Sequence, residues 1–67
     1  RDYYANTRPQ ANADHEVPTG DCAWLPRKKN RLYLGQFSTC YGALLAARAL
    51  YERVTGCARS SPECHTS

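Results

Sequence analysis

Apolar and polar residues alternate most regularly over residues 31–34, which read Arg-Leu-Tyr-Leu. This alternation places the two leucines on one face of an extended chain and predicts a strand. Segment 2–7 contains an aromatic pair and ends in threonine, which predicts a second strand, and residues 15–17 are expected to be briefly extended. A polar turn separates the apolar run 22–25 from 31–34, so we expect these two runs to form a hairpin.

An amphipathic segment predicts a helix over residues 39–55. The segment is rich in Leu, Ala, Arg and Glu, which have high helix propensity, and Ser38 is the candidate N-cap. Gly56 follows as a candidate left-handed stop at the C-terminal end of the helix. At a helical period the apolar residues share one face, which we expect to pack against the sheet. These residues are Cys40, Ala43, Leu44, Ala47, Leu50, Tyr51 and Val54.

Together these elements predict an α+β fold in one domain, residues 1–67. A small two- to three-stranded antiparallel sheet is expected to pack on one C-terminal α-helix, and residues 56–67 are expected to form an irregular tail that contains cysteines. The chain has 42% hydrophobic and 22% charged residues, as ordinary globular proteins do. No apolar run reaches the length of a membrane span. The chain begins at Arg1 rather than Met, so we expect further residues upstream.

Four cysteines, Cys22, Cys40, Cys57 and Cys64, are a high number for 67 residues. A chain this short buries little apolar surface, so covalent cross-links would supply stability that the core lacks. Four cysteines allow three pairings, and the sequence does not choose between them. We favour Cys22–Cys40 with Cys57–Cys64, because each bridge then closes a separate piece of structure. Reduced structural thiols are the alternative.

A zinc site is a second interpretation of this region. Its candidate ligands are His15, Cys22, Cys57 and Cys64. These side chains are of the types that bind zinc, but no close pair such as C-x2-C occurs among them. A third interpretation is a thiol-redox role for Cys57 and Cys64. Catalysis by a cysteine with His15 or His65 would need a third orienting group and a sheltered pocket, so we expect neither an enzyme nor a cofactor.

The net charge of +3 is unevenly distributed along the chain. Residues 22–67 hold seven basic and two acidic side chains, a balance of +5. The densest basic cluster is Arg27, Lys28, Lys29 and Arg31, with Trp24 and Tyr33 on either side. Basic side chains beside aromatic ones are typical of surfaces that contact phosphates and stack on bases. Nucleic acid is therefore an alternative partner, although the charge is mild for that role and a solvated hairpin tip is the simpler explanation.

The chain resembles a group of small bacterial proteins that share the pattern DHEV…CxxLP…NRxYLGxF…GC…CHTS. The matching residues are Tyr3-Tyr4, Asn6, 14–17, Cys22, Leu25-Pro26, 30–37, Cys40, the alanine-rich helix, Gly56-Cys57 and 64–67. The resemblance implies a bacterial source and a short sheet with one helix, and it implies no biochemical role. The chain departs from the group at Pro18, where histidine is typical of relatives, and at Ser60 and Ser61, where one or two cysteines would be typical. The loss of these cysteines counts against zinc.

From the sequence we therefore expect a non-enzymatic small domain, an interaction or structural module, with a protein as its unknown partner. Nucleic-acid contact and a zinc or thiol-redox role are the alternatives. Stable disulfides would indicate a periplasmic or secreted protein, whereas the resemblance implies a protein without a signal peptide, in a reducing cytoplasm. The sequence therefore does not decide between a periplasmic or secreted location and a cytoplasmic one.

Overall fold

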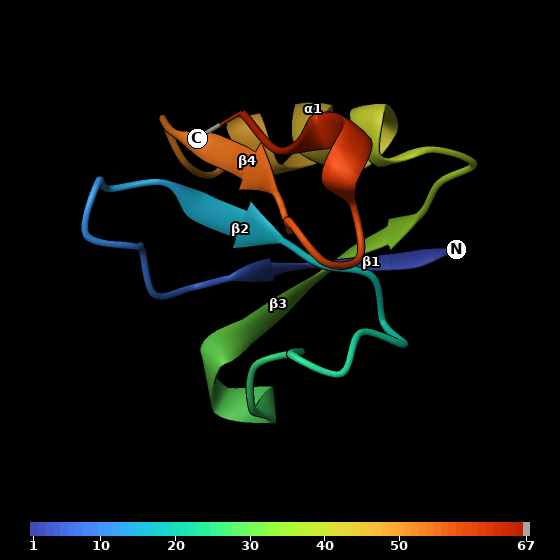
Figure 1. Cartoon of the computed structure of the whole chain (residues 1–67), viewed down its shortest axis with the longest axis horizontal. Helices are drawn as coiled ribbons and strands as arrows, with labels where there is room; N and C mark the ends of the chain where they lie inside the picture. Colours follow the sequence, from blue (N-terminus) through green and yellow to red (C-terminus); the bar gives the residue numbers. More distant parts are fainter. Residues whose placement is uncertain (67) are drawn as a thin grey trace.

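The structure is a computed structural model and describes residues 1–66. Strands β1 (Asp2–Asn6) and β3 (Arg31–Gln36) pair antiparallel, and strands β2 (His15–Val17) and β4 (Val54–Gly56) pair parallel. Within the described residues there are one α-helix, α1 (Cys40–Arg48), and two 3-10 helices, η1 (Lys28–Asn30) and η2 (Pro62–Cys64). The predicted α+β fold with one helix is confirmed, but β4 and η2 follow α1, so the helix is not C-terminal (Figure 1).

Strand β1 links the two small sheets. On one side it pairs with β3 along its whole length. On its other side, the Tyr4 N–H donates to the Pro18 carbonyl oxygen at 3.0 Å. The Gly20 N–H donates to the Asp2 carbonyl oxygen at 2.9 Å. The chain that leaves β2 therefore runs beside β1, and the backbone groups of β1 are used on both edges.

The predicted hairpin between 22–25 and 31–34 is wrong. Residues 22–25 turn instead of extending, and the Leu25 N–H donates to the Cys22 carbonyl oxygen at 3.1 Å. Strand β3 pairs with β1, which alternates the buried side chains of Tyr3 and Ala5 with more exposed ones. Strand β1 therefore offers β3 a longer partner with one buried face. The apolar run 22–25 has only four residues and no such alternation.

The helix begins at Cys40, as expected to within one residue, but it ends at Arg48 rather than at 55. The chain then turns back, and Val54–Gly56 become β4. Val54 and Thr55 are β-branched and favour extended structure, and β2 supplies the backbone partners. A parallel pair such as β2–β4 needs a long crossover connection, which β3 and α1 provide. The sequence pattern missed β4 because Val54, the apolar residue of this strand, continues the helical period.

Gly56 has a packing role rather than the predicted capping role. A Cβ atom at this position would lie 2.5 Å from the Cys64 Cβ and 2.5 Å from the Ser61 carbonyl oxygen. Only glycine therefore lets η2 lie so close to β4. The predicted N-cap Ser38 is also displaced by one residue, because Thr39 is the N-cap and its side chain makes no capping hydrogen bond.

The core lies between α1 and the strands. Its buried residues are Tyr3, Val17, Cys40, Ala43, Leu44, Ala47, Val54 and Cys64. The small side chains of Ala43 and Ala47 are fully buried, so the helix approaches the strands closely. The predicted buried face is confirmed within α1, whereas Leu50, beyond the helix end, is 55% exposed. No helix within residues 1–66 is long and apolar enough to cross a membrane.

Candidate functional site

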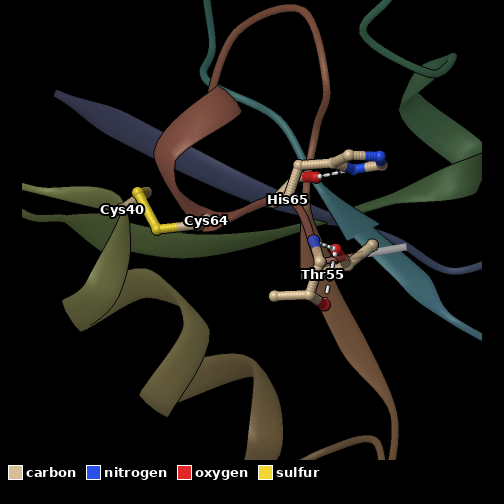
Figure 2. Close-up of a disulfide and its surroundings, with 6 residues drawn as sticks. Cys40, Thr55, Cys64 and His65 are labelled. Carbon is tan, nitrogen blue, oxygen red and sulfur yellow. Dashed lines mark hydrogen bonds between the residues drawn. A yellow bond between two sulfur atoms is a disulfide. The ribbon is translucent and has the colours of Figure 1, made fainter.

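A disulfide joins Cys40, the first residue of α1, to Cys64, the last residue of η2. Figure 2 shows this bridge between the helix and the C-terminal segment. Both cysteines are buried in the core. The predicted pairing of Cys22 with Cys40 and of Cys57 with Cys64 is therefore wrong. Strand β4 carries η2 back to the start of α1, so the bridge crosses the core instead of closing a short local loop.

Hydrogen bonds hold the segment that follows the bridge against β4 (Figure 2). The His65 ring donates from Nδ1 to the Gly56 carbonyl oxygen at 3.0 Å, which places the proton on that nitrogen. The Thr66 N–H donates to Thr55 Oγ1 at 2.9 Å. These contacts give His65 a structural role at the disulfide.

The other two cysteines are free thiols that lie side by side. The Cys22 Sγ and the Cys57 Sγ are 4.0 Å apart, although 35 positions separate them in the chain. Cys22 is half-buried in the turns that follow β2, and the Trp24 N–H donates to its sulfur at 3.4 Å. Cys57 is buried directly after β4. The sequence named both residues but did not pair them, because only the β2–β4 pairing brings these positions together.

Burial raises the pKa of the Cys57 thiol, but hydrogen bonds to its sulfur more than offset this effect. The sulfur accepts from the backbone N–H groups of Ser60 and Arg59 and from the Ser60 hydroxyl, with a further contact from the Cys22 thiol. The pKa of Cys57 is therefore lowered below the ordinary value of a cysteine. The thiolate is the nucleophilic form, and the lowered pKa means that a larger fraction of Cys57 is thiolate at a given pH than in an ordinary thiol.

The structure does not bring together the four residues of the alternative zinc site. They were His15, Cys22, Cys57 and Cys64. Cys22 and Cys57 are neighbours, whereas Cys64 is bonded to Cys40 and the His15 ring stacks on Tyr51. No group of three or more His, Cys, Asp or Glu side chains within residues 1–66 is arranged to hold a metal ion. Of the proposed ligand set, the geometry retains a pair of thiols.

His15 and its acidic neighbour Asp14 have structural partners. The His15 ring stacks on Tyr51 with 3.8 Å between the ring centroids, and its Nδ1 donates to the Asn6 carbonyl oxygen at 2.8 Å. The buried Asp14 carboxylate accepts from the Arg53 Nε at 2.9 Å. These contacts hold the turn between α1 and β4, residues 51–53, against the start of β2, and they give His15 structural partners.

Three of the four residues of the predicted basic cluster are exposed on η1 or beside it. They are Arg27, Lys28 and Lys29. The fourth, Arg31, is half-buried, with its guanidinium 5.0 Å from the centroid of the Tyr4 ring and its Nη1 donating to the Pro26 carbonyl oxygen at 3.2 Å. In Figure 1 this segment projects below the strands, away from α1. Arg31 thus fixes the turn, while the other three cations face solvent.

Exposed aromatic rings lie on the same part of the chain. Trp24 is 63% exposed, and the Arg59 guanidinium lies 4.6 Å from the centroid of its ring. Tyr33 is 52% exposed, and its hydroxyl donates to an Asp2 carboxylate oxygen at 2.8 Å. Sequence reasoning found both rings but missed the Arg59 contact, which depends on the turn after β4. This cation–π contact holds the segment that follows β2 against that turn.

The outer face of α1 is a second exposed surface. Tyr41 and Leu45 are 60% and 67% exposed, and with Leu44 and Arg48 they line a hollow of about 320 Å³. An exposed apolar face of this kind is typical of protein contact surfaces. This surface lies on the side of the molecule opposite η1 (Figure 1).

Comparison with known proteins adds no relationship. No protein-family model, no curated protein and no solved structure matches the chain. The interpretation of the sites therefore depends on their geometry and chemistry.

Proposed function

We propose that the chain is a non-enzymatic interaction module that contacts nucleic acid through its basic turn. The observation that carries this proposal is the set of three exposed cations, Arg27, Lys28 and Lys29, on a segment that projects from the strands. Residues 22–51 contain no Asp or Glu, so the neighbouring sequence supplies no carboxylate to neutralise them. Clustered positive charge of this kind attracts phosphate groups.

The exposed aromatic rings favour single-stranded nucleic acid over a duplex. Trp24 and Tyr33 offer exposed ring surface to unpaired bases, which a duplex would keep stacked on each other. The Arg59 contact steadies the Trp24 ring, so less side-chain freedom is lost when a base stacks on it. The aromatic rings and the cations together therefore provide both elements that single-strand binding uses.

The size of the basic cluster sets the expected strength of binding. Contacts with three phosphates of a single strand give a slope of about −2 in a plot of log affinity against log salt concentration. Such a small footprint supports only weak binding that does not depend on sequence, with Kd on the order of 10⁻⁴ M at physiological salt, the weak end of the range for non-specific binding. We therefore expect the affinity to fall by about 16-fold between 50 and 200 mM salt, which is mild for a protein that binds nucleic acid.

The test compares two double variants with equal net charge. Lys28→Ala/Lys29→Ala removes two cations from the basic turn, and Arg8→Ala/Arg48→Ala removes two exposed cations elsewhere. Binding of a labelled single-stranded oligonucleotide is measured by fluorescence anisotropy over a range of salt concentrations. The first variant is expected to reduce the salt slope by about 1.4 and to weaken binding, while the second retains most of the affinity.

Trp24→Ala separates stacking from charge. Loss of one base stack is worth about 1–3 kcal/mol, so affinity is expected to fall by at least about fivefold with the salt slope unchanged. Circular dichroism confirms that each variant is folded, as expected for substitutions of exposed side chains. The proposal is wrong if the wild-type chain does not bind at low salt, or if both double variants lose the same affinity.

A further inference from the structure

We propose that Cys22 and Cys57 form a second, reversible disulfide by exchange with a small-molecule disulfide, for which glutathione disulfide is the probe. The inference is independent of nucleic-acid binding, because it uses the thiol pair and not the basic turn. It gives the chain a redox modification site in addition to the buried bridge between Cys40 and Cys64.

The geometry places the two sulfurs within reach of a bond. Their separation is 4.0 Å, and a disulfide needs about 2.05 Å, so they must approach by about 2 Å. Cys22 lies in a turn in which its N–H donates to the Thr19 carbonyl oxygen at 3.2 Å. Cys57 begins another turn, in which the Ser61 N–H donates to its carbonyl oxygen at 2.8 Å. Neither sulfur is carried by a long helix or by the centre of a strand, so local adjustment can supply the movement.

Two contacts already hold these turns together. The Thr19 N–H donates to the Ser60 hydroxyl oxygen at 3.2 Å, and the Arg59 guanidinium lies over the Trp24 ring. Each contact joins the segment of Cys22 to the segment of Cys57. The bridge would therefore close between parts of the chain that the folded structure already places in contact, which limits the entropy lost on closure.

The two thiols differ in access and in ionisation, so they have different roles. Cys22 is half-buried and is the sulfur that a small disulfide can reach. Cys57 is buried, with 6% of its surface exposed, which shields it from direct attack. Hydrogen bonds to the Cys57 sulfur hold its pKa below the ordinary value, so it is available as a thiolate next to Cys22. We therefore assign Cys22 as the entry sulfur and Cys57 as the resolving sulfur.

The reaction consists of two thiol–disulfide exchanges. Cys22 loses its proton to solvent, its sulfur attacks one sulfur of glutathione disulfide, and the glutathione S–S bond breaks as one glutathione thiolate leaves. The Cys57 thiolate then attacks the Cys22 sulfur of this mixed disulfide, and the second glutathione thiolate leaves. Each glutathione thiolate takes up a proton from solvent, which balances the protons that Cys22 and Cys57 have released to solvent. The protein therefore loses two protons and two electrons, and glutathione disulfide is reduced to two glutathione thiols.

The test uses the full chain with the Cys40–Cys64 bridge intact and the other two thiols reduced. The protein is incubated with glutathione disulfide, free thiols are blocked with N-ethylmaleimide, and intact mass and a proteolytic map are recorded. The wild-type chain is expected to lose two hydrogens, to retain no glutathione, and to contain a Cys22–Cys57 peptide link. Reduced glutathione in excess is expected to restore both thiols.

Two single variants identify the roles. Cys57→Ser removes the resolving sulfur, so one glutathione is expected to remain on Cys22. Cys22→Ser leaves only the shielded thiol of Cys57. Its rate of modification is expected to be roughly tenfold or more below that of Cys57→Ser. Trp24 fluorescence gives a second readout in the wild-type chain, because the Trp24 N–H donates to the Cys22 sulfur. The fluorescence is expected to change at the same rate as the two hydrogens are lost.

Three results would overturn the inference. The first is a wild-type chain that retains glutathione without forming the Cys22–Cys57 link. The second is a new link that includes Cys40 or Cys64, which would mean that the buried bridge exchanges instead. The third is equal modification of the two single variants, which would remove the assigned roles. None of these results bears on the binding of oligonucleotides, so the two proposals can fail separately.

Discussion

Removal of the Cys40–Cys64 bridge is expected to take away much of the stability of the fold. The bridged residues are 24 positions apart, and closing a loop of that length in the unfolded chain corresponds to about 3.5 kcal/mol at 25 °C in the chain-entropy model. A chain of 67 residues is expected to have a total free energy of unfolding of about 3–10 kcal/mol. The bridge therefore accounts for roughly a third or more of that total.

The background for this measurement is Cys22→Ser/Cys57→Ser, in which the Cys40–Cys64 bridge is the only disulfide that can form. Urea unfolding is followed by far-ultraviolet circular dichroism with and without reductant. For so small a domain the dependence of unfolding free energy on urea is about 1 kcal/mol per molar, so reduction is expected to lower the midpoint by about 3 M or to abolish the folded baseline.

Cys40→Ala/Cys64→Ala, made in the same background, provides the matched control. This variant is expected to unfold at or below the midpoint of the reduced protein and to show no response to reductant, because it has no bridge to break. Equal midpoints for the oxidised and reduced background protein would refute the reasoning. In that case the small alanine-lined core would hold the fold without a covalent link.

Two further predictions concern β4 and the residue that follows it. Gly56→Ala is expected to destabilise the fold by more than about 3 kcal/mol in urea unfolding, because its Cβ would lie 2.5 Å from the Cys64 Cβ and from a backbone oxygen of Ser61. Burial raises the pKa of Cys57, but hydrogen bonds to its sulfur lower the pKa by more. Titration of thiolate absorbance should therefore show a midpoint below that of an ordinary cysteine, and Ser60→Ala should raise this midpoint. Because the folded pKa is the lower one, the unfolded chain binds more protons between the two values. The contribution of Cys57 to stability is therefore present above the unfolded pKa and is lost as the pH falls through the folded pKa.

Each of these predictions has its own control. A Cβ at Gly20 would lie 3.3 Å from Tyr4 Cε1 and 3.4 Å from Asp2 Cβ, so Gly20→Ala is expected to have a much smaller effect than Gly56→Ala. Equal destabilisation by the two substitutions would contradict the close-approach argument. For Cys57, the same midpoint in the wild-type chain and in Ser60→Ala would show that the hydroxyl does not stabilise the thiolate.

Several parts of the fold could be predicted from short stretches of sequence. The alternation in 31–34 indicated β3, and the aromatic pair in 2–7 indicated β1. The start of α1 and the face that it buries followed from a 3.6-residue period. These predictions succeeded because propensity and periodicity act over a few neighbouring residues.

The candidate site could be predicted only in part. The sequence identified the exposed cations of the basic turn, but it grouped Arg31 with them, although that side chain packs on Tyr4. It identified all four cysteines but chose the wrong pairs, because it assumed that each bridge closes a separate piece of structure. The neighbouring thiols of Cys22 and Cys57 could not be found without the pairing of strands that are far apart in the chain.

What the chain determined by itself is therefore local: where strands and the helix begin, which helix face is apolar, and which side chains could react or carry charge. The end of α1, the parallel β2–β4 pair and the Cys40–Cys64 bridge were decided by the tertiary structure. The physical reason is competition between local and distant partners. Val54 fits a helical period, but pairing with β2 satisfies the backbone groups of Val54–Gly56 and brings η2, with its cysteine, to the start of α1.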